Sequence, residues 1–184
     1  MIIYIHGFAG SGMSSKAKVL REELTGCDFI APSLSTIPSL AIETLKELIS
    51  SFMKQDKVYL IGSSLGGYYA IYLAEYFNIP AVLINPAVNP QGTLNQYLGQ
   101  NNNLYDNSYY EWNVKHMDML QAYEVKNITS ELYLLLLQKG DELLNYKEAI
   151  HKYKNTSSIV IDGGSHRFEY IEKYTEEIKQ FLCV

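Results

Sequence analysis

The most informative stretch of this chain reads Val58-Tyr59-Leu60-Ile61-Gly62-Ser63-Ser64-Leu65-Gly66-Gly67. An aliphatic run typical of a buried strand ends at Gly62, and a helical pattern begins directly after Ser64. In so tight a turn the apical residue takes a strained backbone conformation, and bulky side chains two positions before or after it would collide with neighbouring backbone. Because Gly62 and Gly66 occupy those positions, the pattern predicts a nucleophile elbow that lifts the Ser64 hydroxyl clear of the sheet. Ser63 lacks a glycine two residues before it and is the weaker candidate.

Short aliphatic or β-branched runs alternate with helical periodicity along the rest of the chain, which is typical of a parallel sheet covered on both faces. Six strands are expected: Ile2–Ile5, Asp28–Ala31, Lys57–Ile61, Ala81–Ile84, Glu131–Leu137 and Ser158–Ile161. Amphipathic helices are expected at Leu40–Met53, Leu65–Phe77 and Arg167–Leu182. Together with the elbow, this order predicts an α/β-hydrolase-type, mostly parallel six-stranded sheet with helices on both faces and the strand order 2-1-3-4-5-6.

The length of 184 residues suits a single domain over residues 1–184. One long segment, residues 86–127, interrupts the alternation of strands and helices and shows no clear strand. An insertion of this length between two strands usually has a function, so we expect a small cap over the site. Its aromatic residues could line an acyl pocket: Tyr97, Tyr105, Tyr109, Tyr110, Trp112 and Tyr123.

Charge and composition narrow the class of protein. A net charge of -5 without any run of Lys and Arg makes nucleic acid and anionic membranes unexpected partners. The apolar N-terminal run is too short for a signal peptide or a membrane span.

Cys27 and Cys183 form no recognisable spacing, which favours a reducing, cytoplasmic setting. The histidines show no paired ligand spacing, so no metal is expected; His116 and His151 are expected to face solvent.

An activated serine needs a base, and the base needs a group that holds its tautomer. In this fold class the acid and the histidine follow the serine along the chain. Asp141 comes after the fifth expected strand, and His166 comes after the sixth, both at the carboxyl edge of the sheet that also carries Ser64. Glu142 is a rival for the acid, whereas Asp162 is expected to form a turn or to assist.

The loop after the first strand reads His6-Gly7-Phe8-Ala9-Gly10-Ser11-Gly12. Its glycines allow the loop to pass close to the expected nucleophile, Ser64. We therefore expect the backbone N–H groups of Phe8 and Leu65 to form an oxyanion hole. His6 is expected to brace this loop. A phosphate-binding P-loop would need Lys at position 13, where Met13 stands, so no nucleotide cofactor is expected.

The chain resembles the YqiA-like esterases, small bacterial α/β-hydrolases, nearly from end to end. The resemblance rests on Tyr4-Ile5-His6-Gly7-Phe8, Gly62 to Ala70, Pro80-Ala81-Val82, Asn85-Pro86-Ala87-Val88, Tyr97-Leu98-Gly99-Gln100-Asn101, Gly140-Asp141-Glu142 and Gly163-Gly164-Ser165-His166. Ser165 replaces the Asn that we associate with the last motif. The resemblance implies hydrolysis of a small-molecule acyl ester or thioester by a Ser64–Asp141–His166 triad without a cofactor. The alternatives are an acyltransferase or thioesterase that uses the same triad, and a non-catalytic ligand-binding protein on a hydrolase scaffold.

Overall fold

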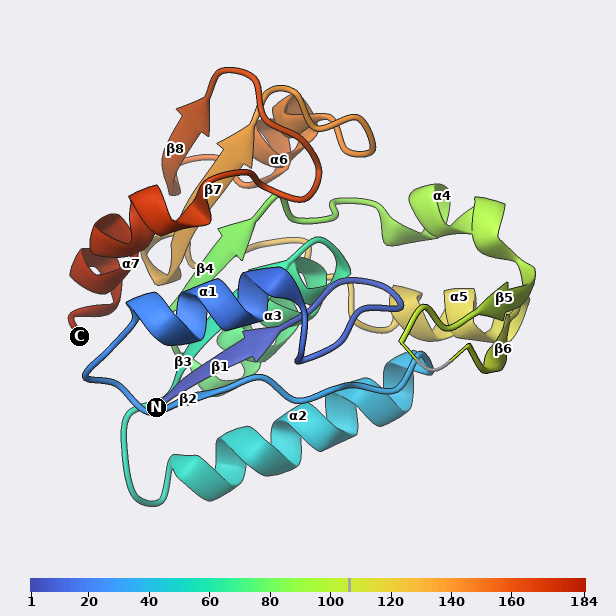
Figure 1. Ribbon diagram of the computed structural model, residues 1–184, viewed down its shortest axis with the longest axis horizontal. Coiled ribbons are helices and arrows are strands. Elements are labelled where there is room, and N and C mark those ends of the chain that lie inside the picture. Colours follow the sequence, from blue (N-terminus) through green and yellow to red (C-terminus); the bar gives the residue numbers. More distant parts are fainter. Residues whose placement is uncertain (106) are drawn as a thin grey trace.

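The computed structural model describes residues 1–105 and 107–184, and its centre is a six-stranded sheet (Figure 1). Each neighbouring pair of strands in this sheet runs parallel. The observed order β2-β1-β3-β4-β7-β8 confirms the predicted order, because β7 and β8 are the fifth and sixth strands of the sheet. The strands are β1 (Ile2–Ile5), β2 (Phe29–Ile30), β3 (Tyr59–Ser63), β4 (Ala81–Ile84), β7 (Tyr133–Gln138) and β8 (Ser157–Ile161).

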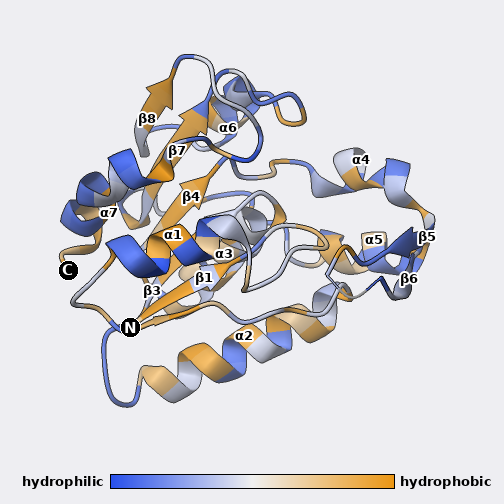
Figure 2. Ribbon diagram, in the orientation of Figure 1, coloured by the Kyte–Doolittle hydropathy of each residue, from blue (hydrophilic) through white to orange (hydrophobic). Residues whose placement is uncertain are grey.

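Helices cover both faces of the sheet, as predicted. Alternate side chains of strand β1 point to opposite faces and are buried on both. Ile2 and Tyr4 pack with α1 (Ser15–Glu23) and α7 (Thr175–Leu182) on one face. Ile3 and Ile5 pack with the helices of the other face, which are α2 (Pro38–Phe52), α3 (Leu65–Phe77) and α6 (Tyr146–Lys152). Figure 2 shows the consequence, since the central strands are hydrophobic along their length while α1, α2 and α7 are apolar only in part. Neither α1 nor α6 was predicted from the sequence.

The segment between β4 and β7 differs from the prediction, because it contains two strands. Strands β5 (Gly99–Asn102) and β6 (Tyr109–Trp112) pair antiparallel as a separate hairpin. The hairpin is flanked by α4 (Pro90–Leu94), a 3₁₀ turn (Asn95–Tyr97) and α5 (Val114–Gln121). The prediction of no strand was wrong because β5 reads Gly-Gln-Asn-Asn, a polar and largely exposed run without an apolar face (Figure 2).

The last helix is also shorter than predicted. Helix α7 begins at Thr175, whereas the sequence pattern predicted a helix from Arg167. Phe168 and Tyr170 have φ values of 60° and 59°, in the left-handed region that an α-helix of L-residues cannot use. A 3₁₀ turn over Ile171–Tyr174 joins this irregular stretch to α7.

The topology places a crevice where the site is expected. Strand β1 has β2 on one side and β3 on the other, and α1 and α3 leave the carboxyl ends of β1 and β3 toward opposite faces. Diverging connections of this kind open a crevice at the carboxyl edge of a parallel sheet. The loop after β1 and the turn after β3 therefore meet at one edge. Within residues 1–105 and 107–184, no helix has both the length and the apolar character needed to cross a bilayer.

Candidate active site

The turn between β3 and α3 has the backbone of a nucleophile elbow. Ser64, at its apex, has φ 56° and ψ -121°, a strained conformation for a residue with a side chain. A Cβ atom on Gly66 would lie 2.0 Å from the carbonyl oxygen of Ile5, and one on Gly62 would lie 2.3 Å from the carbonyl oxygen of Gly66. Only glycine fits at these two positions, so α3 can begin directly at Leu65 and leave the Ser64 side chain on the cavity side.

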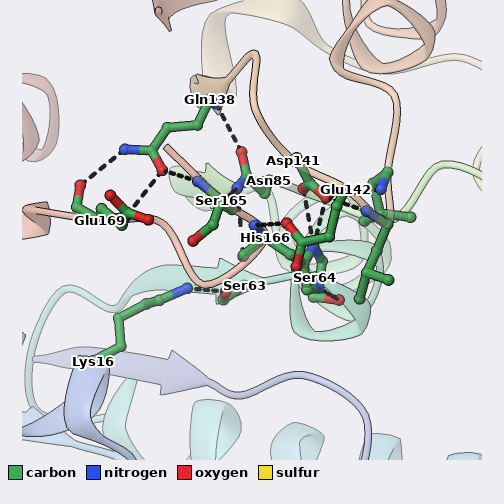
Figure 3. Close-up of polar contacts among 12 residues, drawn as sticks. Lys16, Ser63, Ser64, Asn85, Gln138, Asp141, Glu142, Ser165, His166 and Glu169 are labelled. Atoms are coloured by element: carbon green, nitrogen blue, oxygen red, sulfur yellow. Dashed lines mark hydrogen bonds and ion pairs between the residues drawn. The ribbon is translucent and has the colours of Figure 1, made fainter. Parts of the chain in front are cut away.

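The structure brings Ser64, Asp141 and His166 together although they come from three different loops (Figure 3). The Ser64 Oγ atom lies 3.0 Å from His166 Nε2, and His166 Nδ1 lies 2.9 Å from Asp141 Oδ2. A carboxylate can only accept hydrogen bonds, so the proton of the neutral His166 imidazole lies on Nδ1. His166 Nε2 is then free to accept a hydrogen bond from the Ser64 hydroxyl. The Asp141 side chain is 2% exposed, and the backbone N–H groups of Leu143 and Leu144 donate to its Oδ1 at 2.9 and 2.8 Å. The carboxylate is therefore held in one orientation against the imidazole.

The rival residues have other partners. Glu142 Oε2 accepts from the backbone N–H of His166 at 2.9 Å, and this hydrogen bond lowers the pKa of the Glu142 carboxyl. Asp162 forms an ion pair with Lys139 at 2.7 Å. The Ser63 hydroxyl accepts from Lys16 Nζ rather than meeting His166. Of these acids, only Asp141 contacts the imidazole.

Two buried amides hold the loop that carries His166, and sequence reasoning missed both roles. Asn85 Nδ2 donates to the carbonyl oxygens of Ser165 and His166 at 3.1 and 3.4 Å, and its Oδ1 accepts from the Gln138 N–H at 2.9 Å. Gln138 Oε1 accepts from the Ser165 and Glu169 N–H groups, and its Nε2 donates to the Glu169 carbonyl (Figure 3). Asn85 belongs to one of the motifs of the resemblance, and position was the other signal, because Asn85 follows β4 and Gln138 ends β7.

Comparison with known proteins places the chain in a family. The model of the uncharacterised protein family UPF0227 matches residues 1–183. The chain belongs to the UPF0227 family. It is 27% identical over 186 residues to a UPF0227 protein of Vibrio parahaemolyticus, and 25% identical over 192 residues to the UPF0227 protein YcfP of Escherichia coli. Each alignment covers 98% of this chain and 98% of the relative. These matches confirm the resemblance to the YqiA-like proteins.

A solved structure confirms the predicted fold class of this UPF0227 protein. Est1E of Butyrivibrio proteoclasticus, determined with ferulic acid bound, superposes with a TM-score of 0.77 at 16% sequence identity. The superposition covers 99% of this chain and 87% of Est1E. The architecture is therefore that of the α/β-hydrolases.

The loop after β1 lies against Ser64 of the UPF0227 chain. A Cβ atom on Gly7 would lie 3.2 Å from Ser64 Cβ, so the absence of a side chain there allows the close approach. His6 is buried and braces this loop: Nδ1 donates to the Gly7 carbonyl at 2.8 Å, and Nε2 accepts from the Leu34 N–H at 2.9 Å. Burial lowers the pKa of His6, which keeps the imidazole neutral and its Nε2 able to accept.

A cavity of about 500 Å³ opens beside Ser64 and His166. Phe8 and Leu65, the residues whose backbone N–H groups were predicted to form an oxyanion hole, both line it. The segment between β4 and β7 forms one wall with Ala87, Pro90, Thr93, Leu94, Gln96, Tyr97, Leu104 and Tyr105. The hairpin and its flanking turns therefore cover part of the cavity.

The aromatic residues of this segment were predicted to line a pocket, and only some of them do. Tyr97 and Tyr105 line the cavity, but Tyr109 is 71% exposed. Trp112 is fully buried and packs edge-on against Phe8, with ring centroids 4.8 Å apart. Tyr110 also contacts Phe8, and Tyr123 packs against Tyr72 of α3. Trp112 and Tyr110 therefore pack β6 against the loop after β1, Tyr123 packs the end of α5 against α3, and none of these three lines the cavity.

Lys16 is a cavity residue that the sequence did not single out. It lies in the first turn of α1, and its Nζ donates to the Ser63 hydroxyl at 2.6 Å (Figure 3). Burial lowers the pKa of the Lys16 ammonium to about 8. The sequence does not indicate that this lysine reaches the cavity, because the residues that surround its side chain depend on how α1 packs on the sheet.

Metal ligands do not gather in the part of the chain that the structure describes: no three His, Cys, Asp or Glu side chains are placed to hold an ion. Of the two histidines expected to face solvent, His151 is exposed. His116 is half-buried, which corrects the prediction, because its Nδ1 accepts from the Asn113 N–H at the start of α5 and its ring packs against Trp112.

Proposed function

We propose that this UPF0227 protein is a serine esterase that hydrolyses carboxylic esters or thioesters of small molecules through an acyl-enzyme intermediate. The observation that carries the proposal is the unbroken line of hydrogen bonds from the Ser64 hydroxyl through His166 to Asp141, at 3.0 and 2.9 Å. A serine, an imidazole and a buried carboxylate in this order are the groups that nucleophilic acyl transfer requires. A protein that only bound a ligand would need none of the three.

In the first half-reaction, Ser64 Oγ attacks the carbonyl carbon while its proton passes to His166 Nε2. Negative charge develops on the carbonyl oxygen, and the backbone N–H groups of Phe8 and Leu65 stabilise it. Asp141 holds the imidazole and stabilises the imidazolium that forms. His166 then gives its proton to the departing alcohol or thiol, which leaves the acyl group on Ser64.

The second half-reaction releases the acyl group. His166 takes a proton from a water molecule, whose oxygen attacks the acyl carbonyl, and Ser64 recovers its proton as the acid leaves. No step needs a cofactor or a metal. The whole chain acts as one domain, in which the segment over residues 86–127 serves as a cap on the acyl cavity.

Ester and thioester panels test the proposal. Purified protein is assayed with 4-nitrophenyl esters and acyl-CoA thioesters of graded acyl length, and Ser64→Ala should lose activity by on the order of a million-fold. Ser63→Ala is the matched control, because its hydroxyl meets Lys16 instead of His166 and its loss should stay below tenfold. Turnover of thioesters alone would identify a thioesterase. Equal rates for wild type and Ser64→Ala across both panels would refute the proposal.

A further inference from the structure

Among the lining residues that the structure describes, the cavity beside Ser64 has cationic side chains and no carboxylate. Lys16 and Arg167 both line it, and none of the lining side chains in the described part of the chain is an Asp or a Glu. The protein as a whole carries a net charge of -5, so the sign of the cavity is opposite to that of the molecule. A cavity that accepted only neutral acyl chains would gain nothing from two cations.

Lys16 forms no direct ion pair in the described part of the chain. Its Nζ donates to one neutral oxygen, the Ser63 hydroxyl, and among residues 1–105 and 107–184 no carboxylate lies within 4.0 Å of it. An ammonium has three donors and no acceptor, so two of its hydrogens are available to a ligand. Tyr4 lines the same cavity, but burial raises its pKa to about 12 and its phenol stays neutral. The charge of Asp141 acts on Lys16 without direct contact, and Asp141 is itself hydrogen-bonded to His166, so the ammonium has no ion-pair partner in the described residues.

Arg167 supplies the second cation. It follows His166 directly and its side chain is exposed, with no ion pair or hydrogen bond in the described residues. A guanidinium presents paired N–H donors that match the two oxygens of a carboxylate or phosphate. The cavity is therefore lined by two cationic side chains without an ion-pair partner among the described residues, one exposed and one partly buried.

The two cations flank the two reacting groups. Lys16 contacts Ser63, the neighbour of the nucleophile, and Arg167 is the neighbour of the base. Because consecutive Cα atoms are about 3.8 Å apart, the Lys16 ammonium lies within about 11 Å of the Ser64 hydroxyl. This upper limit allows one small substrate to present an anionic group to Lys16 and a carbonyl to Ser64.

We propose that Lys16 and Arg167 form an anion subsite, and that the preferred substrates are short esters or thioesters with a carboxylate or phosphate near the scissile carbonyl. The inference rests on the proposed esterase function and adds the substrate class. The anionic group sits either on the acyl side, as in a half-ester of a dicarboxylic acid, or on the leaving side, as in the ester of a phosphorylated alcohol. Either source presents the same pair of oxygens to the two cations.

Matched substrates separate these two sources. On the acyl side, monomethyl succinate and monomethyl glutarate are compared with the neutral amides methyl succinamate and methyl glutaramate. On the leaving side, 2-phosphoethyl butyrate is compared with 2-hydroxyethyl butyrate. Acid release is titrated, and the ratio of kcat/KM for each anionic ester to that of its neutral partner is the readout. We expect a ratio of at least about tenfold on one side, the range of a hydrogen bond to a charged group.

Three variants connect that ratio to the subsite. Lys16→Met should lower the ratio by about tenfold or more, and Arg167→Gln, which removes an exposed side chain without partners, should lower it by several fold. Lys18→Met is the matched control, because Lys18 lies on the same helix but points outward, with its side chain 73% exposed. Its ratio should equal that of wild type. If Lys16→Met fails to fold, Arg167→Gln alone still gives the answer.

The outcomes are distinguishable. Wild-type protein that hydrolyses neutral and anionic esters equally well in both series would overturn the subsite and leave the esterase intact. A preference for anions that survives both Lys16→Met and Arg167→Gln would also overturn it. If wild type hydrolyses none of these esters and none of the ester and thioester panel, the proposed function itself fails.

Discussion

Replacing Asn85 by Ala should damage the site without changing the side chains of Ser64, Asp141 or His166. The Asn85 amide is 3% exposed and joins β7 to the His166 loop through one accepted and two donated hydrogen bonds. The variant leaves the buried N–H of Gln138 without its partner, which costs about 1–3 kcal/mol. Asn85 also has φ 40°, where Ala is strained by a further 1 kcal/mol or so. The expected loss in the free energy of unfolding is therefore about 3 kcal/mol.

Activity should fall for a separate reason. Without Asn85 the carbonyl groups of Ser165 and His166 lose their common donor, and a shift of about 1 Å in a catalytic group can lower the rate by about 100-fold. Because the imidazole rather than the substrate-binding walls would move, kcat should fall while KM changes little. A loss confined to stability would indicate a structural role alone.

The assay combines urea unfolding, followed by the fluorescence of the buried Trp112, with ester hydrolysis well below the unfolding transition. Asn78→Ala is the matched control, because Asn78 ends α3 with a similar φ of 52° but makes no contact with the His166 loop. It should lose about 1 kcal/mol and keep full activity. The reasoning would be refuted if Asn85→Ala matched Asn78→Ala in both stability and kcat.

Three further predictions follow from single residues. Gly66→Ala should destabilise the protein by more than about 3 kcal/mol and lower Tm accordingly, because the new Cβ meets the Ile5 carbonyl at 2.0 Å; an unchanged Tm would contradict the elbow geometry. Burial lowers the pKa of His6, so the unfolded chain binds a proton that the folded one refuses, and the free energy of unfolding should fall as pH drops below about 6.5. Urea titrations at pH 7 and pH 5 should show a smaller loss in His6→Gln, and an equal loss would exclude His6 as the cause. Since the pKa of Lys16 is about 8, the preference for anionic esters in kcat/KM should decline as pH rises through 8; a ratio that stays constant to pH 10 would argue against Lys16 as the anion's partner.

Local sequence patterns were sufficient to predict the sheet and the elbow. Each core strand is a short aliphatic run, and Gly62 and Gly66 have no room for a side chain, so these residues report on the fold without any knowledge of their distant neighbours. The placement of Ser64, Asp141 and His166 at one edge of the sheet was predictable for the same reason, because each residue follows a recognisable strand.

The parts that were not predicted depend on polar contacts, most of them between residues far apart in the sequence. Strand β5 is polar, and its pairing with β6 is visible only in space. Asn85 holds a loop that lies 80 residues further along the chain, and Lys16 reaches Ser63 across 47 residues. Such contacts depend on where a polar side chain points after the helices and strands have packed. Hydrophobic periodicity carries no information about the direction of a polar side chain.

Covalent labelling tests the assignment of Ser64 as nucleophile most directly. The protein is treated with a fluorophosphonate, which reacts with activated serines, and the adduct is located by peptide mass mapping. We predict one adduct, on Ser64, formed rapidly in the wild type and in Ser63→Ala, and formed at least a thousand times more slowly in His166→Ala because the hydroxyl loses its base. No adduct on Ser64, or an adduct that forms equally fast without His166, would contradict a catalytic Ser64–His166 pair.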